Sequence, residues 1–228
     1  MGKRPKPTNP EGSVAEPDDP DGETDRDCHG EGDREVVRVL FVCTANRVRS
    51  PFAAAVTLRR AGALGLPLHV ESAGLLGSDD DQALEQIERQ ARRYGTDLSD
   101  HRSTSVTVEL LDSSDLVVTM TGRQIVGLVD LSKPARLKTV TLREWARLSG
   151  AGAAIAEWTR AGVSDWLVDA IDRPVDVLLS GTHDVVDPTT RWPHRFGRTA
   201  AEIDRLVGIC LDSPPADRSV ALCVVPNE

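Results

Sequence analysis

A cysteine, an arginine and a serine in the first quarter of the chain have side chains that could carry out chemistry together. Cys43, Arg49 and Ser50 form the pattern C-x5-R-S. A thiolate is a strong nucleophile, and a planar guanidinium can bind two oxygens of a tetrahedral anion at once. The pattern therefore predicts nucleophilic attack on a tetrahedral oxyanion such as a phosphate group.

The residues around this pattern predict the elements that position it. The apolar run Val39–Val42 indicates a buried strand that stops at Cys43, and Ser50 followed by Pro51 indicates that Ser50 caps a helix. A loop between a strand and a helix start can direct backbone N–H groups into one concavity, which would bind the anion and favour the thiolate form of Cys43. A buried structural cysteine is the alternative interpretation, but it accounts for neither Arg49 nor the helix start.

The segment LFVCTANRVRSPFAAAV closely resembles the signature loop of the low-molecular-weight protein tyrosine phosphatases, in the phosphotyrosine protein phosphatase I superfamily, which also includes arsenate reductases. Four further segments resemble the family in the same order, so the resemblance spans roughly residues 36 to 211. These segments are VESAGL (Val70–Leu75), DLSDHRS (Asp97–Ser103), DLVVTMT (Asp115–Thr121) and HDVVDP (His183–Pro188).

The resemblance assigns expected roles to individual residues. Cys43 would be the nucleophile, and Asp187, in a Val-Asp-Pro sequence, would be the general acid. Arg49 would bind the phosphate together with the backbone of the whole loop, Thr44, Ala45, Asn46, Arg47, Val48, Arg49 and Ser50. Asn46, Ser50, Ser72 and His101 would support that loop. Asp184, three residues before Asp187, could in principle serve as the acid instead.

The chain departs from the family pattern at three places. Val48 stands where many members carry a second cysteine, and Arg47 replaces a small apolar residue, which would add positive charge at the pocket rim. Thr189 and Thr190 stand where tyrosines often follow the acid, and 77–81 holds no aromatic residue. These departures predict a weak preference for phosphotyrosine unless a tryptophan supplies the missing wall, the candidates being Trp145, Trp158, Trp166 and Trp192.

Alternating strand and helix patterns predict an α/β fold whose ligand site lies beyond the carboxyl ends of the strands. The resemblance implies a flavodoxin-like, three-layer α/β/α arrangement with a four-stranded parallel sheet in the order 2-1-3-4. The other expected strands are Leu68–Ser72, 115–120 and 137–141, and the expected helices include 82–95, 106–112 and 197–211. The segment 149–182 is interpreted as an insertion, and SVALCVV near the C-terminus as an added strand.

Composition limits the remaining classes. The formal net charge is −9, and residues 1–34 are rich in Pro, Gly and acidic residues, so they are expected to form a disordered acidic tail before a domain over 35–228. The chain shows no basic face for nucleic acid and no apolar run long enough for a membrane span. The four cysteines lack zinc-ligand spacing, which predicts no metal and fits a reducing cytoplasm.

These observations together predict a cytoplasmic protein tyrosine phosphatase that hydrolyses phosphomonoesters through a phosphocysteine intermediate without a cofactor. Its expected partners are a phosphotyrosine protein or a small aryl phosphate, and a cognate tyrosine kinase is a further candidate. Two alternatives stay open: an arsenate reductase that uses an external thiol, and a catalytically slow phosphate-binding regulatory module.

Overall fold

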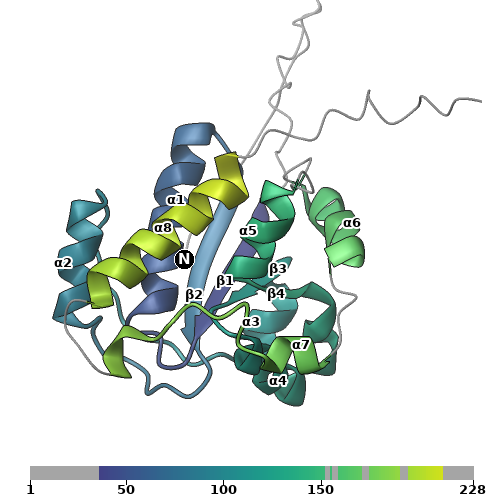
Figure 1. Cartoon of the computed structure of the whole chain (residues 1–228), viewed down its shortest axis with the longest axis horizontal. Helices are drawn as coiled ribbons and strands as arrows, with labels where there is room; N and C mark the ends of the chain where they lie inside the picture. The colour runs from purple at the N-terminus through teal and green to yellow at the C-terminus, as the bar shows by residue number, and fades with distance from the viewer. Residues whose placement is uncertain (1–35, 152–154, 156–158, 171–174, 191–194, 213–228) are drawn as a thin grey trace, which may run out of the picture. The chain divides into compact units, whose positions relative to one another are not determined.

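A parallel sheet lies at the centre of the part of the chain that the structure describes (Figure 1). The structure is a computed structural model and describes residues 36–151, 155, 159–170, 175–190 and 195–212. The sheet has four strands in the order β2-β1-β3-β4, which confirms the predicted order. Its strands are β1 (Val37–Cys43), β2 (Leu68–Gly74), β3 (Leu116–Thr119) and β4 (Thr139–Thr141).

The central strand β1 is buried on both faces, which explains why it is a continuous apolar run rather than an alternating one. Val39 and Phe41 belong to one hydrophobic cluster, whereas Leu40 and Val42 belong to the cluster on the opposite face. Successive side chains of a strand point to opposite faces, so β1 contributes to both cores. The predicted three-layer arrangement is therefore confirmed.

Different helices cover the two faces of the sheet (Figure 1). One face packs against α1 (Arg49–Leu64), α2 (Glu85–Arg93), α5 (Leu142–Gly150) and α8 (Arg195–Asp212). The other packs against α3 (Val108–Ser113), α4 (Gly122–Leu131) and the 3₁₀ helix η1 (Lys133–Lys138). No helix among the described residues is long and apolar enough to cross a membrane.

Several predicted boundaries are wrong, for local reasons. The helix predicted over 82–95 begins only at Glu85, because Gln82 instead pairs with Arg102 in an isolated β-bridge. The strand predicted over 137–141 begins at Thr139, because the residues before it form η1. Ser50 does not cap α1: the N-cap is Val48, without a side-chain cap bond.

The predicted insertion, 149–182, contains the helices α6 (Arg160–Ala170) and α7 (Val175–Leu179). Trp166 of α6 packs against Trp145 of α5 in the core, with ring centroids 6.4 Å apart, so neither supplies an aromatic wall to a surface pocket. That interpretation is wrong for these two residues. The two other candidates, Trp158 and Trp192, lie outside the described residues, as do the predicted tail 1–34 and the predicted final strand.

Helix α7 lies directly against the start of α4. A Cβ added to Gly122 would lie 1.8 Å from the carbonyl oxygen of Leu178, which leaves room for glycine alone. This contact brings the end of the insertion beside the carboxyl end of β3, where a ligand site is expected.

Candidate functional site

The loop between β1 and α1 holds the predicted nucleophile at its first position. Cys43 is the last residue of β1 and is only 3% exposed. The hydroxyl of Ser50, in the first turn of α1, donates a hydrogen bond to Cys43 Sγ over 3.0 Å. The hydroxyl of Ser50 therefore contacts the atom that would act as the nucleophile.

The hydrogen bonds of this loop with its described surroundings are made by its carbonyl oxygens rather than by its backbone N–H groups. The carbonyl oxygens of Cys43 and Thr44 accept hydrogen bonds from the backbone of Leu75 and Leu76. Among the described residues, none accepts a hydrogen bond from the backbone N–H groups of residues 44–48. Five successive N–H groups without an acceptor, beside the positive end of a helix, form a site for an anion.

Asn46 holds the loop in this shape. Its φ of 52° is left-handed, a conformation that asparagine tolerates better than most residues. Its side-chain amide donates to Ser50 Oγ (3.0 Å) and Ser72 Oγ (2.8 Å), and its side-chain oxygen accepts from the N–H of Thr104 (2.9 Å). Its backbone oxygen accepts from His101 Nε2 (2.7 Å). The structure thus brings the predicted supporting residues together around Asn46.

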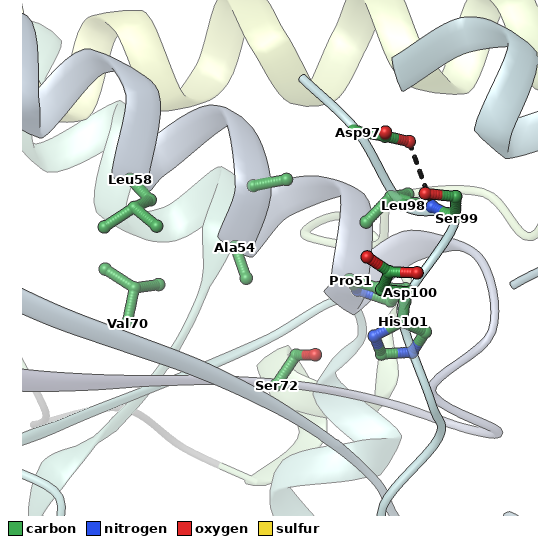
Figure 2. A pocket seen from close by; sticks show the side chains of 11 residues that line it. Pro51, Ala54, Leu58, Val70, Ser72, Asp97, Leu98, Ser99, Asp100 and His101 are labelled. Carbon is green, nitrogen blue, oxygen red and sulfur yellow. Dashed lines mark hydrogen bonds between the residues drawn. The ribbon is translucent and has the colours of Figure 1, made fainter. Parts of the chain in front are cut away.

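Figure 2 shows where two of these supports lie, Ser72 on β2 and His101 on the segment after Asp97. Both line a separate pocket of about 300 Å³ behind the loop. Because the partner of His101 is a carbonyl oxygen, Nε2 must carry a proton. Burial lowers the pKa of His101 below its usual value; the bond to Asn46 opposes this shift and the charge of Arg102 reinforces it.

Arg49 joins the loop to the segment that carries the predicted acid. Its side chain is nearly fully buried and donates to Asp187 Oδ2 over 2.5 Å, to the carbonyl oxygen of Val185 over 3.1 Å and to Thr44 Oγ1 over 3.3 Å. The other oxygen of Asp187 accepts hydrogen bonds from the N–H and the hydroxyl of Thr189. Thr189, one of the departures from the family pattern, therefore fixes the carboxylate.

The structure distinguishes Asp187 from Asp184. One oxygen of Asp184 accepts from the backbone N–H of Gly122 over 2.9 Å, so this carboxylate holds the start of α4. Asp187, in contrast, contacts the arginine of the loop. Its position suits a group that exchanges a proton with a ligand bound there.

A cavity of about 660 Å³ opens beside Thr44 and Arg49. Its wall is aliphatic and polar, and no aromatic side chain is among its described lining residues: Thr44, Arg49, Leu75, Leu76, Thr121, Arg123, Gln124, Gly181, Asp184, Val185, Val186 and Asp187. Arg47 is not among these lining residues; its guanidinium donates to the carbonyl oxygen of Gln82 and lies 3.7 Å from Asp81.

Sequence reasoning missed Gln124. Its side-chain amide donates to Thr44 Oγ1 (3.2 Å), and its side-chain oxygen accepts from the N–H groups of Met120 and Thr121. Thr121 and Gln124 form a capping box at the start of α4. The T-x-x-Q spacing could have revealed the cap, although not the contact with the loop.

The described residues contain no group of side chains that could hold a metal ion. Besides Cys43, Cys210 is free among them; burial on α8 raises its pKa well above its usual value. A thiol in that state is a poor nucleophile.

Comparison with known proteins adds to this geometry. Residues 38–162 match the family model described as low molecular weight phosphotyrosine protein phosphatase. The chain is 32% identical over 121 residues to the protein-arginine-phosphatase of Geobacillus stearothermophilus, across 53% of this chain and 77% of that protein. It is 34% identical over 107 residues to the protein-arginine-phosphatase of Bacillus subtilis (strain 168), across 47% and 71%. The crystal structure of a low molecular weight protein tyrosine phosphatase from T. tengcongensis superposes with a TM-score of 0.59 at 26% identity, across 77% of this chain and 98% of the other.

The state of His101 leads to a prediction about stability. The pKa of His101 in the folded state lies below the usual 6.5, so the unfolded chain binds a proton at this residue more readily than the folded chain does. The contribution of neutral His101 to the free energy of unfolding is therefore present above pH 6.5 and is lost as the pH falls below it. Denaturant unfolding between about pH 7.5 and about pH 5.5 should show a steeper loss of stability in the wild type than in His101→Gln. Equal slopes in the two proteins would contradict a neutral, hydrogen-bonded His101.

Proposed function

The chain belongs to the low molecular weight phosphotyrosine protein phosphatase family, and we propose that it hydrolyses phosphorylated protein side chains through a phosphocysteine intermediate. The observation that carries this proposal is the set of backbone N–H groups of residues 44–48, which lie beside Cys43 and Arg49 and have no acceptor among the described residues. An anion bound there would have its central atom next to the thiolate. The phosphatase fold and the similar protein phosphatases support the same reaction class.

In the first step Cys43 Sγ attacks phosphorus, the S–P bond forms, and the bond from phosphorus to the leaving atom breaks. Backbone N–H groups of the loop and the guanidinium of Arg49 hold the other phosphate oxygens, where negative charge gathers. In the second step water attacks the phosphocysteine, which releases inorganic phosphate and restores the thiolate.

Asp187 supplies and recovers the proton in these steps. In the structure its carboxylate pairs with Arg49. A phosphate dianion would compete with Asp187 for this guanidinium and would leave the carboxyl group of Asp187 beside the bound substrate. Asp187 can then give its proton to the leaving atom and later accept one from water.

The alternatives are less well supported. An internal thiol relay for arsenate would need a second reactive cysteine, but Cys210, the other described cysteine, is buried and its pKa is raised. The similar proteins are named phosphatases, which supports phosphate hydrolysis over arsenate reduction with an external thiol. A module that only binds phosphate would need no acid, whereas Asp187 is held against Arg49 and by Thr189.

For the substrate we propose phosphoarginine in proteins. A phosphotyrosine ring would find the aliphatic side chains of Leu75, Leu76 and Val186 instead of aromatic stacking partners, which contribute about 0.5–1.5 kcal/mol each. A flexible arginine side chain needs no aromatic wall, because its aliphatic stem can pack against these aliphatic side chains. Two similar proteins are named protein-arginine-phosphatases, which supports this choice.

The role of Asp187 can be tested through the basicity of the leaving group. General acid catalysis contributes about 10² to 10⁴-fold and matters most when the leaving atom is basic. Asp187→Asn should therefore slow hydrolysis of phenyl phosphate far more than that of nitrophenyl phosphate. Asp184→Asn is the matched control and should leave the ratio of the two rates unchanged. The opposite pattern would assign the acid to Asp184.

The substrate proposal can be tested with two peptides of one sequence that carry either phosphoarginine or phosphotyrosine. Phosphate release should show a higher kcat/KM for the phosphoarginine peptide. Leu76→Tyr would add an aromatic wall at an exposed lining position and should raise kcat/KM for phosphotyrosine about 2- to 10-fold.

The control for this substitution is Leu137→Tyr, at an exposed position that is not among the residues lining the cavity. A wild-type preference for phosphotyrosine would overturn the choice of substrate but not the mechanism.

A further inference from the structure

Arg123 lies at the mouth of the catalytic cavity. It is the second residue of α4, is exposed, and lines the cavity together with Thr44, Arg49 and Asp187. Neither the expected family roles nor the mechanism above uses it.

The guanidinium of Arg123 has no partner among the described residues, with which it forms neither a hydrogen bond nor an ion pair. The two carboxylates of the cavity are engaged elsewhere, Asp184 by the N–H of Gly122 and Asp187 by Arg49 and Thr189. An arginine carries five N–H donors in a rigid fork, so Arg123 can bind a carboxylate with two of them.

The place of Arg123 within its helix is electrostatically unfavourable. The first turn of α4 contains no acidic residue, and the N-terminal end of a helix carries partial positive charge. A cation in the first turn is therefore repelled by the helix dipole, and a neutral or acidic residue would stabilise the helix better. Departures from such local rules are expected at functional sites, so the place of Arg123 at the edge of this cavity supports a role in ligand binding.

We propose that Arg123 forms an anion subsite that binds an acidic side chain of the substrate next to its phosphorylated residue. The transferred phosphate already has the loop N–H groups and Arg49, which come from a different element, so Arg123 is available for a second anion. The inference rests on the proposed function, since it names a sequence preference of the same site. It predicts that acidic residues beside the phosphorylated residue favour binding.

The experiment uses the full chain and phosphopeptides that differ only in having Glu or Gln on either side of the phosphorylated residue. The wild type should prefer the Glu peptides about 3- to 5-fold in kcat/KM, mainly through KM, as expected for a partly exposed ion pair. In Arg123→Gln this preference should disappear. Arg123→Glu should instead prefer peptides that carry Lys at these positions over peptides that carry Glu. The matched control is Arg136→Gln, at an exposed arginine away from the cavity, which should keep the wild-type preference.

A wild-type preference that survives in Arg123→Gln would overturn the subsite. The subsite would also be overturned if Arg123→Gln lowered kcat for nitrophenyl phosphate as much as it lowered kcat for the peptides. Arg123 would then act on the transferred phosphate. Binding of the same peptides to Cys43→Ser protein, measured by fluorescence polarisation, tests the subsite without turnover. Absence of turnover of every phosphopeptide by the wild type would contradict the proposed function. Equal binding of the Glu and Gln peptides to the Cys43→Ser protein would contradict the subsite alone.

Discussion

The left-handed conformation of Asn46 is the constraint on which the rest of the site depends. Its side chain bonds to Ser50, Ser72 and Thr104, and its carbonyl oxygen to His101, so three separate parts of the chain hold one residue. The carbonyl oxygens of Cys43, Thr44 and Arg47 accept hydrogen bonds from surrounding backbone, whereas no described residue accepts one from the N–H groups of 44–48. Such a set of N–H groups would bind an anion.

The first turn of α4 contacts both the loop after β1 and the late segment that carries Asp184 and Asp187. Gln124 holds Thr44 of the loop, whereas Gly122 contacts Leu178 and donates to Asp184 of the late segment. Asp187 consequently reaches Arg49 across 138 positions of sequence. Asp187 and Arg49 are paired in the structure, so an anion bound by Arg49 would compete with Asp187 for one guanidinium.

The sequence revealed the features that depend on neighbouring residues. The buried strand before Cys43 and the spacing to Arg49 are local patterns, whereas the strand order came from the family resemblance. The predicted cap at Ser50 was wrong because the chain is already helical at Arg49, and the hydroxyl of Ser50 bonds to the sulfur of Cys43 instead. The contact between Gln124 and Thr44 depends on packing across 80 positions. The burial of Trp145 against Trp166 likewise depends on how α5 meets α6.

The central claim is that phosphorus becomes bonded to Cys43. Rapid acid quench of the full chain during turnover, followed by peptide mass spectrometry, tests it directly. The account predicts a phosphoryl group on the sulfur of Cys43 that appears within the first turnover and decays as substrate is used up. An Asp187→Asn protein given nitrophenyl phosphate should accumulate more of it, because water is no longer activated. Steady phosphate release with no phosphorylated Cys43 at any quench time would contradict the account.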